Sequence, residues 1–416
     1  MSLPQTTSRI FILAGGLGTR LAHLTKDLPK PMASVGGRPF LEWQIESFRA
    51  QGYRDFVLLV GHRKEAIVDH FGDGSGFGVA IEYSVEEELL GTGGAFLQAL
   101  ERFPCETFVL ANGDTYFPVP LDSLLARSRS APGSVWLAAK LVPKPDRYGT
   151  IVVDDRGEIR SFREKDPRLD EGFINGGVYC GPASAFAGLA ASRCSMETDL
   201  FPRLLGERRL RCLAFGEPFI DIGIPEDFRL AQTLIPRWHA QGKRRALFLD
   251  RDGILIEDTG YVSRPEDVRI LPECLDLLRK ARSLGYFLIV VSNQAGVAKG
   301  KMTMEDVDRV NGRMQAELAK LGVPLDDIFV CPYHPDGTVP GYAASSLDRK
   351  PGPGMILKAA EKWDLDLEKS LLVGDKDSDV IVNTVLRSKI VPGRYDVSNL
   401  GAVASYAEIS KMLERP

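Results

Sequence analysis

The stretch Arg244-Arg-Ala-Leu-Phe-Leu-Asp-Arg-Asp-Gly253 lies beyond the middle of this 416-residue chain. It is a short apolar run that ends in two aspartates, one residue apart, followed by a glycine. A buried parallel strand delivers charged side chains to its carboxyl edge in this way, and such a strand usually begins a central sheet. Because residues 10–235 already form a complete alternating pattern, we interpret the stretch as a second start, so that the chain contains two α/β domains.

The composition excludes several classes of protein. Hydrophobic residues make up 44% and charged residues 26% of the chain, and the net charge of −4 gives no reason to expect binding to nucleic acid or to a membrane surface. There is no apolar run of membrane-spanning length and no signal-peptide core in Met1–Arg9. The six cysteines are scattered, which suits a reducing cytosol, and we therefore expect a cytoplasmic protein.

A short polar stretch predicts the boundary between the domains. Pro236, Gly242 and three basic residues fall between the two patterns. We place the first domain at residues 1–235, a linker at 236–244 and the second domain at 245–416. Both are expected to be Rossmann-like, doubly wound α/β domains, because apolar runs alternate with helical patterns in each.

The first domain begins with a glycine-rich turn. The apolar run Ile10–Ala14 precedes Gly15-Gly-Leu-Gly-Thr-Arg20, and Pro29-Lys-Pro31 follows. Glycines let backbone N–H groups converge on an anion. The turn lacks the Lys-Ser/Thr ending of a P-loop and does not fit the dinucleotide spacing, so its glycines alone are equally compatible with an ordinary βα turn. The fixed charges of Arg20 and Lys30 favour a phosphate cradle.

The turn and Pro29-Lys-Pro31 together resemble the signature of the sugar-1-phosphate nucleotidyltransferases, over residues 9 to about 235. The resemblance implies that Arg20 and Lys30 are catalytic and stabilise the charge that builds up during nucleotidyl transfer. Within this family, Lys26–Ala33 and Gly37–Glu42 are similar to the guanylyltransferases that act on D-glycero-D-manno-heptose 1-phosphate. The resemblance also implies that the turn holds the nucleotide through Gly15, Gly16, Gly18 and Thr19.

The residues after the turn predict a mainly parallel sheet, because strand and helix patterns alternate. The strand pattern that begins at Phe108 leads to Asp114, at the edge where open α/β sheets bind ligands, and Asp221 also follows an apolar run. Two such carboxylates suit a Mg²⁺ shared with substrate phosphates, although lone aspartates at turns are usually caps or turn formers. The other predicted elements are helices at Phe40–Gln51 and Lys64–Phe71 and strands at Phe56–Val60 and Ala80–Ser84.

A second glycine turn, Glu86–Ala95, packs near the base in the resembling family. That resemblance assigns Glu86 to the edge of the base, and Gly91 and Asn112 to nucleotide binding. A carboxylate can accept from guanine N1–H and from the guanine amino group, whereas uracil offers one such donor, so we favour GTP. The alternative is that Glu86–Glu88 is a solvated run of charges.

The same resemblance assigns a sugar-phosphate pocket. In this family a glutamate accepts from sugar hydroxyls, a lysine pairs with the sugar phosphate, and an Asn-Gly turn borders the sugar. Taken alone, the lysine would more often be a surface residue. The matching residues are Tyr148, Gly149, Glu164, Lys165, Asn175 and Gly176.

Four pieces of the second half occur in the order found in the haloacid-dehalogenase-like phosphatases, which the second domain resembles. They are Asp250-Arg-Asp252, Phe287–Gln294, Arg349-Lys350-Pro351 and Leu371–Asp379. An isolated Asp-x-Asp would usually be a turn, but the other three motifs outweigh that interpretation.

The resemblance implies a role for each charged residue. Asp250 is the nucleophile that forms an aspartyl-phosphate, and Asp252 is the general acid and base. Ser292 and Lys350 contact the phosphoryl oxygens. Asp379 is equally compatible with a place behind the metal ligands and with the surface. The implied ligands of a Mg²⁺ that compensates the charge are Asp250, Asp252 through its carbonyl, and Asp375.

Within this superfamily, the motifs together with Gly260-Tyr-Val262 are similar to D,D-heptose 1,7-bisphosphate phosphatase, with histidinol-phosphate phosphatase as a close sibling. The similarity implies that Arg349, Lys350 and Lys376 bind the second phosphate end of the substrate. This set of three cations favours a bisphosphate, because a second phosphate adds about two charges. Asn293 is also assigned to sugar-phosphate binding.

One departure from the family concerns a structural zinc. Where related phosphatases often carry cysteines and a histidine, this chain has Cys331, Tyr333, Ser346 and Asp348. These side chains make a poor tetrahedral zinc site. We therefore expect no zinc, and a loop that is held by packing instead.

The two resemblances suggest one pathway. We predict a bifunctional enzyme that removes the C7 phosphate of D-glycero-D-manno-heptose 1,7-bisphosphate and transfers GMP from GTP to the heptose 1-phosphate, with Mg²⁺ in both domains, for a lipopolysaccharide or other surface glycan. GTP and heptose phosphates are the expected partners, without nucleic acid or membrane, and a homo-oligomer is compatible with the sequence. The alternatives are another sugar or nucleotide (mannose 1-phosphate, ADP- or UDP-sugars), or one domain that only binds or scaffolds.

Overall fold

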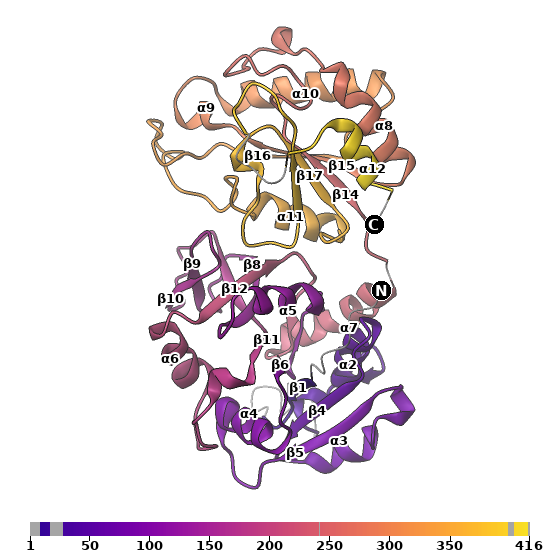
Figure 1. Cartoon of the computed structure of the whole chain (residues 1–416), viewed down its shortest axis with the longest axis vertical. Helices are drawn as coiled ribbons and strands as arrows, with labels where there is room; N and C mark the ends of the chain where they lie inside the picture. Colours follow the sequence, from indigo (N-terminus) through magenta and orange to yellow (C-terminus); the bar gives the residue numbers. More distant parts are fainter. Residues whose placement is uncertain (1–8, 17–27, 241, 398–402, 415–416) are drawn as a thin grey trace. The chain divides into compact units, whose positions relative to one another are not determined.

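The computed structural model of the chain describes residues 9–16, 28–240, 242–397 and 403–414. It divides into two compact units, Met1–Gly242 and Lys243–Pro416. Each unit has its own central sheet with helices packed around it, which confirms the predicted two-domain α/β architecture (Figure 1). None of the described helices combines the length and the apolar character that crossing a membrane requires.

Four parallel strands form the core of the first unit, in the order β6-β1-β4-β5. Ile10 of β1 pairs with Phe56 of β4 on one side and with Val109 of β6 on the other. Ile10, Phe11 and Ile12 have no exposed surface, as expected for a parallel strand whose two faces are both covered. The strands are β1 (Arg9–Leu13), β4 (Asp55–Val60), β5 (Ala80–Val85) and β6 (Thr107–Asn112).

Helices connect these strands, as the alternating pattern predicted. In α3, for example, Ile67 and Phe71 are buried four residues apart on one face, which is the spacing of a helix that packs on a sheet. The helices are α2 (Phe40–Ala50), α3 (Lys64–Phe71), α4 (Gly91–Arg102) and α5 (Leu121–Ser130), with short 3₁₀ turns η2 (Lys30–Met32) and η3 (Ser75–Phe77).

Beyond Asp114 the sheet continues with antiparallel strands. The long strand β11 (Glu171–Pro182) pairs antiparallel with β6, and also with β8 (Val135–Pro143) and β9 (Thr150–Val153). Its register shifts between Asn175 and Tyr179. The remaining elements of this part are β10 (Ile159–Arg163), η4 (Ala183–Phe186), η5 (Met196–Leu200), α6 (Phe201–Gly206) and β12 (Leu210–Phe215).

A small ladder joins two distant parts of the first unit. Strand β7 (Thr115–Tyr116) pairs antiparallel with β13 (Ile220–Asp221), so that Asp221 lies opposite Thr115. The backbone N–H of Ile222 donates to the carbonyl of Asp114 at 3.0 Å. Asp114 and Asp221 are therefore neighbours because of this ladder, although more than a hundred residues separate them.

The last helix of the first unit, α7 (Pro225–Ala240), extends beyond residue 235. Pro236 lies inside it, and the helix continues for another turn, with Trp238 stacked on Tyr116 at a ring distance of 6.1 Å. Residues 236–240 of the predicted linker are thus helical, because the apolar face of α7 packs on a cluster that includes Trp43. A two-stranded hairpin, β2 (Ser34–Val35) with β3 (Arg38–Pro39), contacts the same helix.

The second unit has a five-stranded sheet in the order β16-β15-β14-β17-β18. All of its paired strands are parallel. The apolar run before Asp250 forms the central strand β14, every residue of which is buried. The strands are β14 (Ala246–Leu249), β15 (Phe287–Asn293), β16 (Asp327–Cys331), β17 (Leu371–Gly374) and β18 (Arg387–Ile390).

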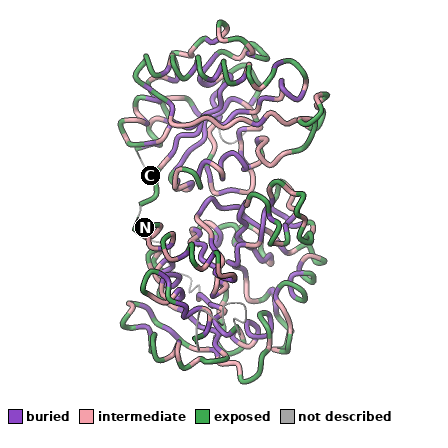
Figure 2. Tube along the Cα trace, turned by 180° about the vertical axis from the view of Figure 1, so that it is seen from behind, coloured by how far each residue is buried: buried purple, intermediate pink, exposed green. Residues whose placement is uncertain are grey.

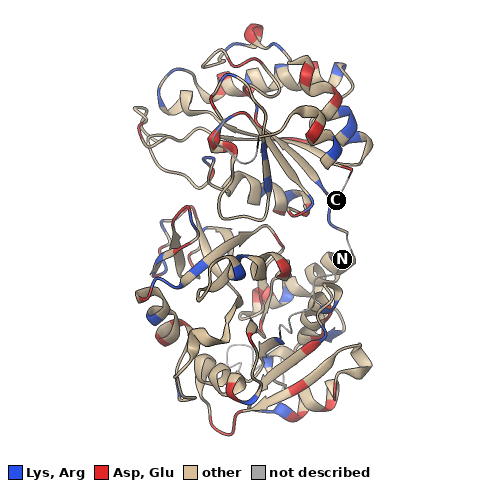
Figure 3. Cartoon of the chain, viewed as in Figure 1, with Lys and Arg blue, Asp and Glu red and all other residues tan. Residues whose placement is uncertain are grey.

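Helices of the second unit cover this sheet, and in both units the buried segments are concentrated in the strands (Figure 2). The longest, α10 (Met304–Lys320), begins at a capping box in which Thr303 and Asp306 bond each other's backbone. Charged residues lie mostly on helices and loops, whereas the strands are largely uncharged (Figure 3). The other helical elements are η6 (Pro265–Asp267), η7 (Pro272–Cys274), α8 (Leu275–Ser283), α9 (Ala295–Ala298), α11 (Gly354–Trp363), η8 (Asp377–Asp379) and α12 (Tyr406–Met412).

Candidate active sites

A cavity of about 690 Å³ opens at the carboxyl ends of β1 and β6. Leu13 and Asn112, the last residues of these two strands, both line it. Gly18, Thr19 and Arg20, which were predicted for the same site, lie outside the described residues. The other predicted residues found in the cavity wall are Gly15, Gly16, Lys30, Glu86, Gly91, Asp114 and Asp221.

Asp114 and Asp221 share the ammonium group of Lys30. Its Nζ lies 2.7 Å from Oδ2 of Asp114 and 3.7 Å from Oδ1 of Asp221. The two carboxylates remain 37% and 31% exposed, so they retain oxygen atoms that face the cavity. This donor set fits a Mg²⁺ ion held by one or two carboxylates, with substrate phosphates and water as its other ligands.

Glu86 is held in the wall of the cavity. Its Oε2 accepts from the backbone N–H of Leu90 at 3.1 Å, and a Cβ on Gly15 would lie 2.9 Å from its Oε1. Burial raises the pKa of the Glu86 carboxyl above its ordinary value. Glu87 and Glu88 are exposed, so the alternative of a solvated charge run describes them but not Glu86.

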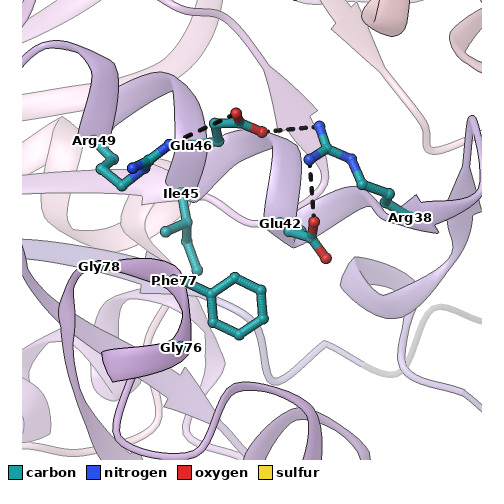
Figure 4. A pocket seen from close by; sticks show the side chains of 8 residues that line it. All are labelled: Arg38, Glu42, Ile45, Glu46, Arg49, Gly76, Phe77 and Gly78. Atoms are coloured by element: carbon teal, nitrogen blue, oxygen red, sulfur yellow. Dashed lines mark ion pairs between the residues drawn. The ribbon is translucent and has the colours of Figure 1, made fainter.

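A second, smaller hollow of about 300 Å³ lies between α2 and the segment Gly76–Gly78 (Figure 4). Its charged groups neutralise one another: Arg38 contacts Glu42 at 3.2 Å and Glu46 at 2.8 Å, and Arg49 reaches Glu46 at 3.8 Å. Phe77 closes one side of the hollow. Because these cations are already paired with carboxylates, this hollow offers much less to a phosphate than the cavity around Lys30 does.

In the second unit, the predicted motif residues meet at the carboxyl edge of the sheet. Asp250 follows β14, Asp375 follows β17, and Ser292 lies near the end of β15. Leu249 pairs with Val290 on one side and with Val373 on the other, so the ends of the three strands are level. Residues far apart in the sequence are thereby brought within reach of one phosphate group.

Three buried carboxylates form a cation site at this edge. Asp250, Asp375 and Asp379 each place an oxygen within 4.8 Å of the others. Burial raises the pKa of Asp375 to about 7, and neither of its carboxylate oxygens has a hydrogen-bond partner among the described residues. A Cβ on Gly253, where φ is +90°, would lie 2.1 Å from Oδ2 of Asp375. Nζ of Lys376 lies 3.7 Å from Oδ1 of Asp375, which is beyond hydrogen-bonding distance. Because buried carboxylate oxygens without hydrogen bonds are costly, these oxygens fit a hard cation such as Mg²⁺.

Lys350 lies completely inside this group of carboxylates. Its Nζ donates to Oδ1 of Asp250 at 2.9 Å and to Oδ1 of Asp379 at 2.5 Å. Burial lowers the pKa of Lys350, but the two carboxylates outweigh this effect and raise it. Asp379 has no exposed surface and also accepts from the backbone N–H groups of Asp375 and Lys376. Asp379 is therefore a buried support of the site rather than a surface residue.

Asp252 and Ser292 complete the predicted set, and both are buried. Burial raises the pKa of the Asp252 carboxyl, against the opposing effect of the Arg251 charge. A raised pKa favours the protonated carboxyl that a general acid requires near neutral pH. A nucleophilic carboxylate, a neighbouring acid, a buried lysine and a cation site are what hydrolysis through an aspartyl-phosphate needs.

Comparison with known proteins agrees with both geometries. Residues 10–237 match the family model described as nucleotidyl transferase, and residues 246–388 match the one described as polynucleotide kinase 3 phosphatase. The first unit is 39% identical, over 52% of this chain and 95% of the relative, to D-glycero-α-D-manno-heptose 1-phosphate guanylyltransferase of Campylobacter jejuni. The second is 46% identical, over 33% of this chain and 73% of the relative, to D-glycero-α-D-manno-heptose-1,7-bisphosphate 7-phosphatase of Burkholderia mallei.

The chain belongs to the nucleotidyl transferase family and, in its second unit, to the heptose-bisphosphate 7-phosphatases. It is therefore a bifunctional enzyme, as the sequence predicted. Among solved structures, the chain is similar to HddC from Yersinia pseudotuberculosis, with 31% identity and a TM-score of 0.49, over 54% of this chain and 98% of that one.

The nucleotidyltransferase unit contains a cation that the sequence interpretation missed. Arg193 lines the cavity, and no ion pair to it is found among the described residues. The backbone N–H groups of Gly93 and Gly94 donate to the carbonyl of Cys194, and a Cβ on Gly91 would lie 2.6 Å from that carbonyl oxygen. The glycines therefore admit a second chain segment at the start of α4, which carries Arg193 to the cavity.

Asn175 and Gly176 act behind the cavity wall. Nδ2 of Asn175 donates to Oη of Tyr179 at 2.8 Å and to Oε1 of Glu197 at 3.1 Å, and both partners line the cavity. A Cβ on Gly176 would lie 2.5 Å from the ring of Phe117. Asn175 therefore orients residues of the wall, and Gly176 permits close packing.

The other residues predicted for the sugar phosphate are not brought into the cavity wall. Glu164 and Lys165 are exposed beyond the end of β10, and Gly149 is also exposed. Tyr148 is half-buried, and burial together with the nearby Asp221 carboxylate raises its pKa to about 12. Tyr148 thus lies close to the Asp221 carboxylate, whereas Glu164 and Lys165 lie in an exposed segment outside the cavity wall.

In the phosphatase unit, Asn293 does not offer its side chain to the sugar. Its Nδ2 donates to the carbonyl of Lys350 at 3.0 Å, and its Oδ1 accepts from the N–H of Lys350 at 2.9 Å. Asn293 therefore holds the backbone of Lys350. The ammonium group of Lys350 lies against Asp250, so in this structure it is engaged at that carboxylate.

Lys376 lies among the carboxylates of Asp250, Asp258 and Asp375. Its Nζ is 3.2 Å from Oδ2 of Asp258 and 3.8 Å from Oδ2 of Asp250, and it lies over the ring of Tyr395 at 4.8 Å. Tyr395 also donates to Oδ2 of Asp258 at 2.8 Å. Arg349 is partly exposed, and its Nη1 has no hydrogen-bond partner among the described residues.

The loop from Cys331 to Asp348 is held by packing and by backbone contacts. Tyr342 packs on a small cluster that includes Val297 and Met302, and the N–H groups of Thr338 and Val339 donate to the carbonyl of Ala298. At one of the positions where related phosphatases often carry a zinc ligand, the Asp348 carboxylate pairs with Lys358 at 2.7 Å. Side-chain packing, backbone hydrogen bonds and this ion pair therefore hold the loop in place.

Proposed function

We propose that the phosphatase unit removes the C7 phosphate of D-glycero-D-manno-heptose 1,7-bisphosphate, and that the nucleotidyltransferase unit then transfers GMP from GTP to the heptose 1-phosphate. The products are phosphate, pyrophosphate and GDP-heptose. The observation that carries the proposal is that one chain contains both units, each with its own set of carboxylates and lysines. The relatives of the two units are named for consecutive substrates of the same sugar.

The choice of GTP rests on Glu86. Its carboxylate is fixed by Leu90 N–H in the cavity wall, where it could accept from N1–H and the amino group of guanine. Adenine presents a hydrogen-bond acceptor at the position of N1–H, and uracil presents one N–H. With a base that offers fewer donors, this half-buried carboxylate would make fewer hydrogen bonds, which disfavours the other bases.

We assign the α anomer to the sugar. The C1 phosphate is untouched when the C7 phosphate is removed, so both reactions must accept the same anomer. The guanylyltransferase relatives from Campylobacter jejuni and Aneurinibacillus thermoaerophilus are both named for the α form, whereas phosphatase relatives include α and β forms. The transferase therefore sets the anomer for the pair of reactions.

In the nucleotidyltransferase reaction, an oxygen of the sugar phosphate attacks the α-phosphorus of GTP and pyrophosphate leaves. Lys30 and Arg20 would neutralise the charge on the phosphates, and Arg193 would hold the sugar phosphate. Mg²⁺ bound by Asp114 and Asp221 would supply Lewis-acid stabilisation of the same charge.

In the phosphatase reaction, Asp250 attacks the C7 phosphorus while the Asp252 carboxyl gives its proton to the sugar oxygen that leaves. Asp252 then takes a proton from the water that hydrolyses the aspartyl-phosphate. Lys350 and Ser292 would hold the phosphoryl oxygens, and Arg349 and Lys376 would bind the remaining phosphate end. Mg²⁺ on Asp250, Asp375 and the Asp252 carbonyl would compensate the charge of the phosphoryl group.

The experiment that tests the proposal is a coupled reaction followed by ³¹P NMR. With heptose α-1,7-bisphosphate, GTP and Mg²⁺, the enzyme should release phosphate first, and then pyrophosphate with GDP-heptose. Release of phosphate without formation of any nucleotide sugar would refute the proposal that the two units catalyse consecutive reactions. Parallel reactions with mannose 1-phosphate, ATP and UTP would show whether the sugar and the base are those proposed. Such an enzyme would work in the cytoplasm, where GTP is available, and would supply heptose for a surface glycan.

A further inference from the structure

Arg251 separates the two catalytic aspartates in sequence, and it has no exposed surface at all. Arginine is rarely buried to this extent unless its charge and its N–H groups are satisfied. Its neighbours in the sequence already have roles in catalysis, whereas the proposed chemistry gives no task to Arg251. Its contacts show what it does.

One edge of the Arg251 guanidinium faces Asp252. Nε of Arg251 lies 3.2 Å from each carboxylate oxygen of Asp252, and Nη2 lies 3.1 Å from Oδ1. A planar guanidinium with several N–H groups on one carboxylate restricts both its position and its rotation. Arg251 therefore restrains the Asp252 carboxyl, which must reach the leaving oxygen of the substrate.

The other edge of the guanidinium is anchored to two different elements. Nη1 donates to Oδ1 of Asn311, a buried residue of α10, at 3.1 Å. Nη2 donates to Oε1 of Gln294, just beyond β15, at 3.0 Å. Arg251 thus connects Asp252 to a helix and to a strand end that are themselves fixed by packing.

Gln294 extends this network to the phosphate-binding serine. Its Nε2 donates to Oδ2 of Asp252 at 3.0 Å and to Oγ of Ser292 at 2.7 Å. The orientation of the amide is settled, because Arg251 offers only donors and must meet the amide oxygen. Since Oγ of Ser292 accepts from Gln294, its own hydrogen is available for a phosphoryl oxygen.

We propose that Arg251 and Gln294 are positioning residues that hold the Asp252 carboxyl and the Ser292 hydroxyl in register for protonation of the leaving group. The inference rests on the proposed phosphatase chemistry. In that step an oxygen of Asp250 forms a bond to phosphorus, the ester P–O bond breaks, and the ester oxygen takes the proton of Asp252. Asn311 supports the arrangement from α10. A displacement of the acid by about one ångström is enough to lose much of its effect.

Substituted phenyl phosphates separate this role from a structural one. An acidic phenol such as p-nitrophenol leaves without a proton, whereas unsubstituted phenol needs one. The value of kcat/KM depends only on the steps up to the release of the phenol. The later hydrolysis of the aspartyl-phosphate therefore does not affect it. We would measure kcat/KM over a series of phenols for the wild-type enzyme and for R251M, R251K, Q294L and N311L.

The expected result is a steeper dependence of kcat/KM on phenol acidity in R251M and Q294L. Hydrolysis of phenyl phosphate should fall about 100-fold or more, which is the usual size of general-acid catalysis, and that of p-nitrophenyl phosphate by less than about tenfold. R251K and N311L should lie between these variants and wild type. An equal loss for every phenol, with an unchanged slope, would overturn the inference, because a smaller folded fraction lowers all points alike.

R245M is the matched control. Arg245 precedes the same strand β14, but its Nη2 donates to the carbonyl of Leu284 and its guanidinium lies over the ring of Tyr286, at the amino end of the strand. The slope for R245M should equal that of wild type. If R251M does not fold, the dependence of kcat/KM on phenol acidity in N311L and Q294L tests the inference. Failure of wild type to hydrolyse heptose bisphosphate would refute the proposed substrate, whereas the phenol series decides the positioning role separately.

Discussion

The ammonium nitrogen of Lys350 lies 2.9 Å from Oδ1 of Asp250, the proposed nucleophile, and both side chains are almost fully buried. The same ammonium also contacts Asp379. In the first unit, Lys30 has a similar relationship with Asp114, at 2.7 Å. Both catalytic units therefore place a lysine against carboxylates that belong to a cation site, which keeps the net charge of each site low enough for phosphate groups to approach.

The first prediction concerns this buried lysine. K350M should abolish phosphatase activity and reduce the free energy of unfolding of the second unit by about 3–5 kcal/mol, because Asp250 and Asp379 lose their shared counter-charge. Thermal unfolding and phosphate release would be measured. K358M is the control: Lys358 pairs with Asp348 near the surface, so its loss should cost less than about 1 kcal/mol. Equal destabilisation by the two variants would contradict the prediction.

The two activities should be separable by single substitutions. D250N should reduce hydrolysis of heptose bisphosphate by about 1,000-fold or more, because it removes the nucleophile, and should leave guanylyl transfer to heptose 1-phosphate unchanged. D114N should do the reverse, because it removes a metal ligand of the first unit. Both reactions are measured for both variants. Loss of both activities in either variant would show that the two units do not act independently.

Glu86 predicts how GTP binding depends on pH. Because burial raises its pKa, Glu86 takes up a proton at higher pH than an ordinary glutamate, and a protonated carboxyl accepts fewer hydrogen bonds from guanine. The KM for GTP should therefore rise as the pH is lowered through the raised pKa, and be constant above it. E86Q should remove this dependence and lower the preference for GTP over UTP by about 10- to 100-fold, or ~1–3 kcal/mol. A preference that survives E86Q would exclude Glu86 as the base reader.

Gly253 and Gly260 form a pair for testing the cation site. Both have positive φ, of +90° and +108°, but a Cβ on Gly253 would lie 2.1 Å from Oδ2 of Asp375, whereas a Cβ on Gly260 meets open space. G260A should show only the backbone strain of about 1–2 kcal/mol. G253A should in addition displace Asp375 and abolish phosphatase activity. Activity and thermal unfolding would be compared, and equal effects on activity would contradict the close approach to Asp375.

Removal of Mg²⁺ should destabilise the second unit. The oxygens of Asp375, which have no hydrogen-bond partner among the described residues, would gain a ligand contact when the ion binds, and a ligand at about 100 times its Kd stabilises a protein by about 2.7 kcal/mol. The unfolding temperature of wild type should rise with Mg²⁺ and fall with EDTA, whereas D375N should respond much less. A D375N variant with the full Mg²⁺ response would place the ion elsewhere.

Much of the fold could be predicted because its helices and strands follow from patterns of neighbouring residues in the sequence. Alternating apolar runs and helical patterns specify α3 and the strands around β1, and short motifs identify Asp114, Asp250 and Asp375 at strand ends. The extent of α7 beyond residue 235 was not predicted, because Pro236 is normally a helix breaker and the packing of Trp238 on Tyr116 overrides it.

The sequence by itself determined the two families, the order of the units and the motif residues, because each motif is a short segment whose chemistry and backbone requirements are written in consecutive residues. Only the tertiary structure decided which side chains are engaged. It placed Lys350 against Asp250, turned Asn293 towards the backbone of Lys350, and brought Arg193 to the first cavity. These contacts join segments that are distant in sequence, and their spacing along the chain carries no information about them until the sheets and helices have packed.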